Sequence, residues 1–176
     1  MKSKIAETLI SSLGTILFLF LIVPFFLIWI PRRILLSPEL IYRFDISIYR
    51  YLGLAPIVLG VVLYIFCSGS FIFVGKGTPI PFTPTKELIV TGLYRFVRNP
   101  LYIAGVLVLA GEAILFQSLG ILIYCLVMFG VFNVHVMMEE TLLAEKFGTK
   151  YEQYCKSVPR WLPRLTSSVK KGSESK

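Results

Sequence analysis

The chain has 176 residues, of which 56% are apolar and 16% charged, and its mean hydropathy is +0.76. A soluble domain is typically about 45–50% apolar, and here the excess lies in long runs, which argues against a soluble domain and for one membrane domain. The net charge is +8, but the basic residues crowd the ends of the apolar runs, so we expect membrane lipids as their partners and not nucleic acid.

Two long apolar runs come first. Thr8 to Ile30 is long enough, at about 1.5 Å per residue, to cross a hydrocarbon core of about 30 Å. No cleavage site of the small-x-small type follows, so we expect a retained helix that is kinked at Pro24 and ends at Pro31. Leu52 to Val74 is the second predicted span. It carries three glycines that allow close approach of another helix, namely Gly53, Gly60 and Gly69.

A loop rich in glycine and proline, GKGTPIPFTP, follows at residues 75–84. Proline lacks an N–H group and restricts the residue before it, so this stretch predicts an ordered loop at the membrane surface. Leu101 to Phe116 and Leu119 to Met138 are the third and fourth predicted spans. Only Gln117 and Ser118 separate them, so we expect an antiparallel hairpin.

The chain becomes polar after the fourth run. Residues 139–155 predict an amphipathic helix, interrupted at Gly148, that lies at the interface or docks on the core. An extended segment anchored by Trp161 follows, and then a Ser/Lys-rich tail that we expect to be disordered. The predicted fold class is an all-α integral membrane protein with about four transmembrane helices, the last two as a hairpin, plus a C-terminal amphipathic helix.

Three parts are expected along the chain: spans one and two in residues 1–75, a core with spans three and four in residues 76–165, and the tail from 166 to 176. With four spans, the N-terminus, the 75–99 loop and the segment after span four share one side. They hold two, four and eight Lys and Arg, against four in the 31–50 loop. The positive-inside rule therefore predicts a multi-pass protein with cytoplasmic N- and C-termini.

Polar side chains gather where spans three and four are expected to meet the cytoplasmic surface. Arg95, Arg98 and Asn99 precede span three, and Glu139 and Glu140 follow span four. A hairpin would make these two groups neighbours, and such a mixed-charge cluster suits a zwitterionic cofactor. The alternative is that the arginines are helix-end anchors which pair with the glutamates.

Other chemistry-bearing residues are sparse. His135, the single histidine, lies about one turn deeper than Glu139 and is either a proton acceptor or a polar contact between helices. Glu112 is an intramembrane carboxyl group, with a functional or a hairpin-stabilising role. No phosphate-binding loop occurs, and the three cysteines show no CxxC spacing, so no metal site is predicted.

Two blocks of sequence resemble the isoprenylcysteine carboxyl methyltransferase and phospholipid methyltransferase superfamily. Residues 92–105, GLYRFVRNPLYIAG, resemble its GxYRxxRHPxYxG signature, with Gly105 one residue later than the last glycine of the signature. Residues 139–160 resemble its EExxLxxxFGxxYxxYxxxVPR tail. The resemblance covers about residues 75–165. One position departs from it, because Asn99 stands where the family has His; an amide still forms hydrogen bonds but does not titrate near neutrality.

The resemblance implies an integral membrane methyltransferase that uses S-adenosylmethionine at the cytosolic face. With this family in view, we predict catalytic roles for Glu140, Arg98 and His135, the last from its position one turn from Glu139 and not from a motif. Carried over position by position, the resemblance implies cofactor contacts at Tyr94, Arg98, Asn99, Pro100, Tyr102, Gly105, Glu139 and Glu140. Arg160 and Trp161 either contact the bound molecules or anchor the tail.

The acceptor stays open at this point. A methyl group on a sulfonium is already electrophilic, so the enzyme chiefly aligns the reactants. A lipid-like or prenylated carboxylate needs no base, whereas an amine of the phosphatidylethanolamine type must first lose a proton, with help from Glu139, Glu140 or His135. The resemblance favours the carboxylate. Remoter alternatives are a sterol-reductase-like protein that binds a nicotinamide cofactor, and a non-catalytic membrane scaffold or transport subunit.

Overall fold

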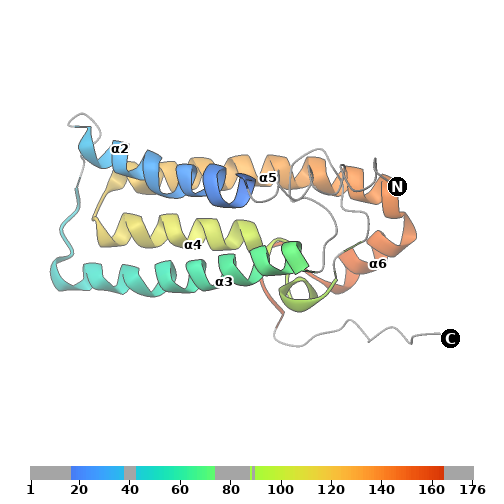
Figure 1. The fold of residues 1–176 in the computed structure, drawn as a ribbon. Helices are drawn as coiled ribbons and strands as arrows, with labels where there is room; N and C mark the ends of the chain where they lie inside the picture. Colours follow the sequence, from blue (N-terminus) through green and yellow to red (C-terminus); the bar gives the residue numbers. More distant parts are fainter. Residues whose placement is uncertain (1–16, 38–42, 74–87, 89, 165–176) are drawn as a thin grey trace.

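The structure is a computed structural model, and it describes residues 17–37, 43–73, 88 and 90–164. Within these ranges the regular secondary structure is entirely helical, which confirms the all-α fold class. One isolated antiparallel bridge joins Arg43 to Ser118. The predictions for the first part of span one, for the 75–84 loop and for the 166–176 tail lie outside the described residues (Figure 1).

The first predicted span is a helix of mixed hydrogen bonding. Two π-helical stretches, η1 (Phe18–Ile22) and η2 (Phe25–Trp29), lead into α2 (Ile30–Leu36), and Pro24 is the N-cap residue of η2. The prediction that this helix ends at Pro31 is wrong. Pro31 lies in the first turn of α2, where a missing N–H group is tolerated, so the helical path continues to Leu36.

Helices α3 (Leu54–Phe73) and α4 (Pro100–Leu115) pack side by side (Figure 1). A 3₁₀ turn, η4 (Ser47–Gly53), precedes α3. Glycines bring the two backbones together: a Cβ added to Gly111 would lie 2.6 Å from the Gly53 carbonyl oxygen, and one added to Gly60 would lie 2.7 Å from the Ala104 carbonyl oxygen. The expected close helix approach is therefore found at Gly53 and Gly60.

Helix α5 (Leu119–Phe147) is a single helix of 29 residues. The fourth predicted span, Leu119 to Met138, and the first part of the predicted amphipathic helix form this one helix, because residues 139–147 are mostly good helix formers. The predicted break at Gly148 is confirmed: this residue has a φ of +52° and separates α5 from α6 (Thr149–Ser157). Figure 1 shows α6 turning back from the end of α5.

Two helical stretches in the described residues are long and apolar enough to cross a membrane, Ser47–Gly69 and Leu119–Phe147. Helix α4 is a shorter apolar helix of 16 residues, and it lies between α3 and α5 (Figure 1). Phe116 to Ser118 connect it to α5, and the buried Ser118 hydroxyl accepts a hydrogen bond from Ile121 N at 3.3 Å. These features agree with a membrane protein.

Candidate functional site

The start of α4 is shaped by local sequence. Gly92, with a φ of +59°, opens the 3₁₀ turn η5 (Gly92–Arg95) in a conformation that glycine adopts without strain. Asn99 is the N-cap residue of α4, and Pro100 occupies its first turn, where the fixed φ of proline suits the helix. This turn places Arg98 and Asn99 at the N-terminal end of α4.

The segment after α6 is fastened against this turn. Arg98 N donates to the Pro159 carbonyl oxygen at 2.9 Å, and Arg164 N donates to the Phe96 carbonyl oxygen at 3.0 Å. The Asn99 side chain does not cap α4; its Nδ2 donates to the Arg160 carbonyl oxygen at 3.2 Å. We call residues 158–164 the tail segment. It begins within the second block of the family resemblance, and these hydrogen bonds join it to the first block.

Glu140 is held between two arginines. Its Oε1 lies 3.1 Å from Arg98 Nη1, and both of its oxygens accept hydrogen bonds from Arg160, with Arg160 Nε at 3.1 Å from Oε1. The Arg98 and Glu140 side chains are only 12% and 18% exposed, and that of Arg160 is 36% exposed. The hydrogen bond to Glu140 raises the pKa of the Arg160 guanidinium. The forked geometry gives strong, directional, charge-assisted bonds.

One nitrogen donor of the Arg98 guanidinium has no acceptor among the described residues. Its Nη1 also lies 2.6 Å from Cys155 Sγ, whereas its Nε is buried and has no hydrogen-bond partner among the described residues. A buried donor without a partner costs about 1–3 kcal/mol. An acceptor oxygen of a bound molecule, charged or neutral, would remove this cost.

A second polar group joins α4 to α5. The Tyr102 hydroxyl donates to Glu139 Oε2 at 3.3 Å, and its ring meets the His135 ring edge-on, with centroids 5.8 Å apart. The Glu139 side chain is exposed, and His135 is half-buried one helical turn away. Glu139, Tyr102 and His135 therefore form a cluster of their own.

Three remaining predicted residues have supporting positions. The Tyr94 carbonyl oxygen accepts a hydrogen bond from the Tyr154 hydroxyl at 2.7 Å, and burial raises the pKa of both phenols, which keeps them neutral. Pro100 is buried in the first turn of α4. Gly105 is also buried, and the nearest atoms to an added Cβ belong to Leu27 and Phe132. Gly105 thus faces apolar neighbours.

Sequence reasoning missed two site neighbours, Cys155 and Asn133. Trp161 Nε1 donates to Asn133 Oδ1 at 3.1 Å. A signal for Asn133 was present, because an amide within an apolar helix is costly unless it has a partner. Cys155 carried no such signal. Glu112, by contrast, lies near the C-terminal end of α4, and the structure does not bring it to Arg98 and Glu140 at the N-terminal end.

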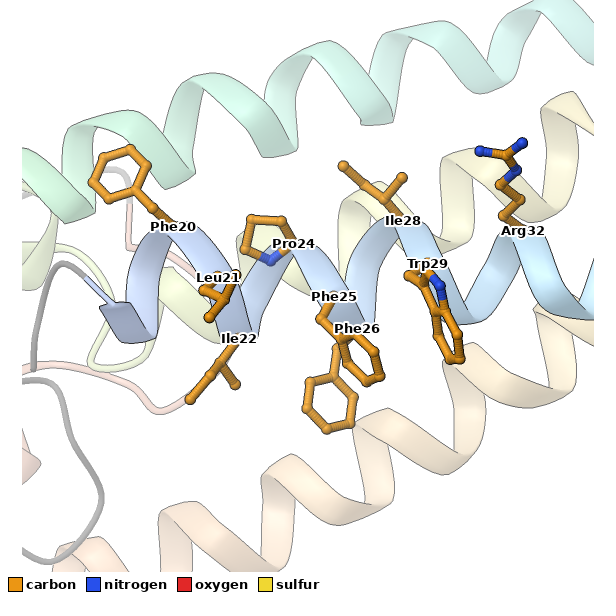
Figure 2. Close-up of a pocket in the computed structure, with 9 residues that line it drawn as sticks. All are labelled: Phe20, Leu21, Ile22, Pro24, Phe25, Phe26, Ile28, Trp29 and Arg32. Atoms are coloured by element: carbon orange, nitrogen blue, oxygen red, sulfur yellow. The ribbon is translucent and has the colours of Figure 1, made fainter.

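An apolar groove of about 620 Å³ lies elsewhere, along the N-terminal helix. Figure 2 shows Phe20 and Ile28 projecting to one side of this helix and Phe26 and Trp29 to the other, with Arg32 at one end. We call Arg98, Glu140 and Arg160 the charged cluster. None of these three residues lines this groove. In the part of the chain that the structure describes, no group of three His, Cys, Asp or Glu is placed to hold a metal ion.

Comparison with known proteins identifies the family. A family model described as phospholipid methyltransferase matches residues 48–150, more than half of the chain. The chain belongs to the phospholipid methyltransferase family. The match runs from η4 through α5 and so includes Tyr94 to Gly105 and the Glu139–Glu140 pair, but it ends before the tail segment.

Three named relatives of the chain agree with this family assignment. The chain is 28% identical over 133 residues to a protein-S-isoprenylcysteine O-methyltransferase of Schizosaccharomyces pombe, across 73% of this chain and 55% of that protein. It is 31% identical over 135 residues to a probable protein-S-isoprenylcysteine O-methyltransferase of Oryza sativa subsp. indica, across 73% of this chain and 67% of that one. A protein of the japonica subspecies matches equally. The chain thus spans little more than half of the yeast relative and about two thirds of the rice ones.

These matches confirm the resemblance inferred from the two sequence blocks. They also confirm the predicted class, a methyltransferase family with apolar helices of membrane-spanning length. The roles of individual residues stay predictions.

Proposed function

We propose that the protein is an S-adenosylmethionine-dependent membrane methyltransferase that methylates the carboxylate of a lipid-like or prenylated acceptor at the cytoplasmic membrane face. The observation that carries this proposal is the partly buried Glu140 held between Arg98 and Arg160, in a chain of the phospholipid methyltransferase family. The names of the yeast and rice relatives favour a carboxylate acceptor.

The residues fit the cofactor by charge. S-adenosylmethionine carries a carboxylate and an ammonium on its amino-acid part. Arg98, with a buried Nε that has no partner among the described residues, suits the carboxylate, and Glu139 and Glu140 suit the ammonium. The proposed contact set is completed by Tyr94, Asn99, Pro100, Tyr102 and Gly105. When bound, the cofactor supplies an electrophilic methyl group on its sulfonium.

The residues of the chain then mainly orient the cofactor and the acceptor and shield them from water. The forked bonds of Arg160 to Glu140 and the hydrogen bond from Asn99 to the Arg160 carbonyl oxygen fix the tail segment beside the start of α4. A carboxylate acceptor is already ionised at neutral pH, so it needs alignment and no proton transfer. Asn99, which does not titrate, is sufficient for this positioning role.

The alternative is N-methylation of a phospholipid amine. Two observations favour it: the description of the matching family, and the cluster of Glu139, Tyr102 and His135 beside the arginines. An amine must lose a proton before it attacks, and Glu139 or His135 would accept that proton.

We propose a four-span arrangement in the membrane, with the last two spans as a hairpin and both termini in the cytoplasm. The charge distribution and the apolar helices α3 and α5 support it. Helix α4, with 16 residues, is about 24 Å long. It falls short of a typical hydrocarbon core, so the bilayer would thin locally around it.

Calorimetry of S-adenosylmethionine binding in detergent tests the function and the site together. The native protein is compared with Arg98→Ala and Glu140→Ala, and with Arg50→Ala as a matched control, because Arg50 is exposed and lies in η4, outside the site. We expect binding that weakens at least tenfold in the two site variants only. Absence of binding to the native protein contradicts the proposed function, whereas equal binding by all variants contradicts the site.

The acceptor class is decided by product chemistry. Labelled methyl groups released by mild base come from an ester and support the carboxylate acceptor. A base-stable labelled phospholipid supports the amine alternative.

A further inference from the structure

The hydrogen bond between Trp161 and Asn133 joins the tail segment to the middle of α5. Asn133 uses both ends of its amide: its Oδ1 accepts from Trp161 Nε1 at 3.1 Å, and its Nδ2 donates to the Phe129 carbonyl oxygen at 2.8 Å. The Trp161 ring also packs on the Phe129 ring, with centroids 5.2 Å apart. The Trp161 side chain therefore makes both a hydrogen bond and an aromatic contact with α5.

This contact lies well below the charged cluster. Asn133 precedes Glu140 by roughly two helical turns, about 10 Å along the axis of α5. Arg160 and Trp161 are neighbours in sequence, yet they bind Glu140 and Asn133 respectively. Two neighbouring side chains of the tail segment thus contact α5 at separate places, one in the charged cluster and the next in the apolar part of the helix.

Arg160 has need of such support. Its side chain is 36% exposed, so its forked bonds to Glu140 are strong only while the guanidinium is held in the right place. Contacts of its own backbone and of the next residue restrict the positions that the Arg160 side chain can reach. Asn99 holds the Arg160 carbonyl oxygen, and Asn133 holds the side chain of the following residue.

We propose that Asn133 is a positioning residue, which with Trp161 forms a latch that holds Arg160 on Glu140 and so shapes the cofactor site. This inference rests on the proposed function, since the site it shapes is the one assigned there to S-adenosylmethionine. It gives the amide in this apolar helix a specific use, which is to bind the tail segment.

Two variants each remove one partner of the hydrogen bond between Trp161 and Asn133. Trp161→Phe keeps an aromatic ring against Phe129 but lacks the N–H donor. Asn133→Leu has similar volume and suits an apolar helix, so loss of folding is not expected. One hydrogen bond contributes about 1 kcal/mol net, so each variant should weaken S-adenosylmethionine binding about fivefold. Because both remove the same bond, the double variant should bind no more weakly than either single one.

Tyr124→Phe is the matched control on the same helix. It removes the hydrogen bond from the Tyr124 hydroxyl to the Phe26 carbonyl oxygen, which lies outside the site. Cofactor affinity should be unchanged in this variant. Asn133→Gln, which keeps the amide, should recover part of the affinity that Asn133→Leu loses.

Fluorescence gives a readout that does not depend on the cofactor. The chain has two tryptophans, so a Trp29→Phe background leaves Trp161 as the single reporter. Asn133→Leu in that background should increase quenching of Trp161 by acrylamide, whereas Tyr124→Phe should not.

The outcomes separate the latch from the function. If the native protein binds S-adenosylmethionine and neither the affinity nor the quenching changes in Asn133→Leu, the latch is refuted and the proposed function stands. Additive losses in the double variant also refute it. If the native protein binds no cofactor, the proposed function fails, and the quenching comparison alone decides whether Asn133 holds the tail segment.

Discussion

Glu139 and Glu140 are adjacent in sequence but have different surroundings. Glu140 is mostly buried and bonded to Arg98 and Arg160, whereas Glu139 is exposed and accepts one long hydrogen bond from Tyr102. Neighbouring residues on a helix point about 100° apart, so only one of them faces the arginines. The pair therefore provides a natural internal comparison.

We predict that Glu140→Gln lowers the stability of the protein by about 1–3 kcal/mol, because two partly buried guanidinium groups lose their counter-charge. Glu139→Gln should cost less than about 0.5 kcal/mol, since an exposed carboxylate loses little on becoming an amide. Thermal unfolding in detergent measures both. Equal shifts in Tm for the two variants would contradict the ion-pair account.

At the residue scale, the sequence predicted that a basic and an acidic group would meet, and the structure places Arg98 beside Glu140. The sequence did not predict which of the two glutamates pairs with the arginines, because this depends on the rotation of α5 within the bundle. The contact of Asn133 with Trp161 was missed for a similar reason. That contact is set by how the tail segment folds back, and this path, like the rotation of α5, depends on long-range packing.

At the scale of elements, the packing of α3 on α4 depends on glycine. We predict that Gly60→Ala and Gly111→Ala each destabilise the protein by about 1–3 kcal/mol, because an added Cβ would lie under 3 Å from backbone atoms of the facing helix. Gly130→Ala in α5 is the control, since no atom of the described residues lies within 4 Å of its added Cβ. Unfolding in detergent measures the difference, and similar stability for all three variants would refute close packing.

The bend between α5 and α6 depends on glycine for another reason. Gly148 has a φ of +52° and a ψ of −130°, and its added Cβ would meet no described atom within 4 Å. We predict that Gly148→Ala costs about 1–3 kcal/mol from backbone strain alone. Gly130→Ala, equally free of contacts but in a regular helix, should be neutral or slightly stabilising. A Gly148→Ala protein as stable as the native one would show that the bend tolerates a side chain.

Element types were easier to predict than element ends. Long apolar runs identified α3, α4 and α5, and the glycine at 148 marked a true break. The predicted end at Pro31 was misplaced, and the continuity of the fourth span with the helix after it was not predicted, because a change from apolar to charged residues does not by itself end a helix. Backbone hydrogen bonds continue across such a change where the residues suit a helix.

For the whole molecule, the proposed topology is open to a direct test. We predict that a fluorescent protein fused after residue 176 is bright, as it is in the cytoplasm, and that an exported phosphatase at the same position is inactive. The physical reason is the excess of Lys and Arg on that side of the proposed membrane arrangement. The reverse pattern of reporter activity would overturn the orientation while leaving the helical fold intact.

The backbone bonds between the tail segment and Phe96–Arg98 also have a consequence for biosynthesis. Proteins are made from the N-terminus, so α3, α4 and α5 emerge before the residues that complete the site. Until Arg160 leaves the ribosome, Glu140 lacks one of its two partners. We therefore expect nascent chains arrested before residue 158 has emerged to be in the membrane but unable to bind S-adenosylmethionine, and chains arrested after residue 164 has emerged to bind it. The enzyme would thus become competent only after its membrane helices are in place.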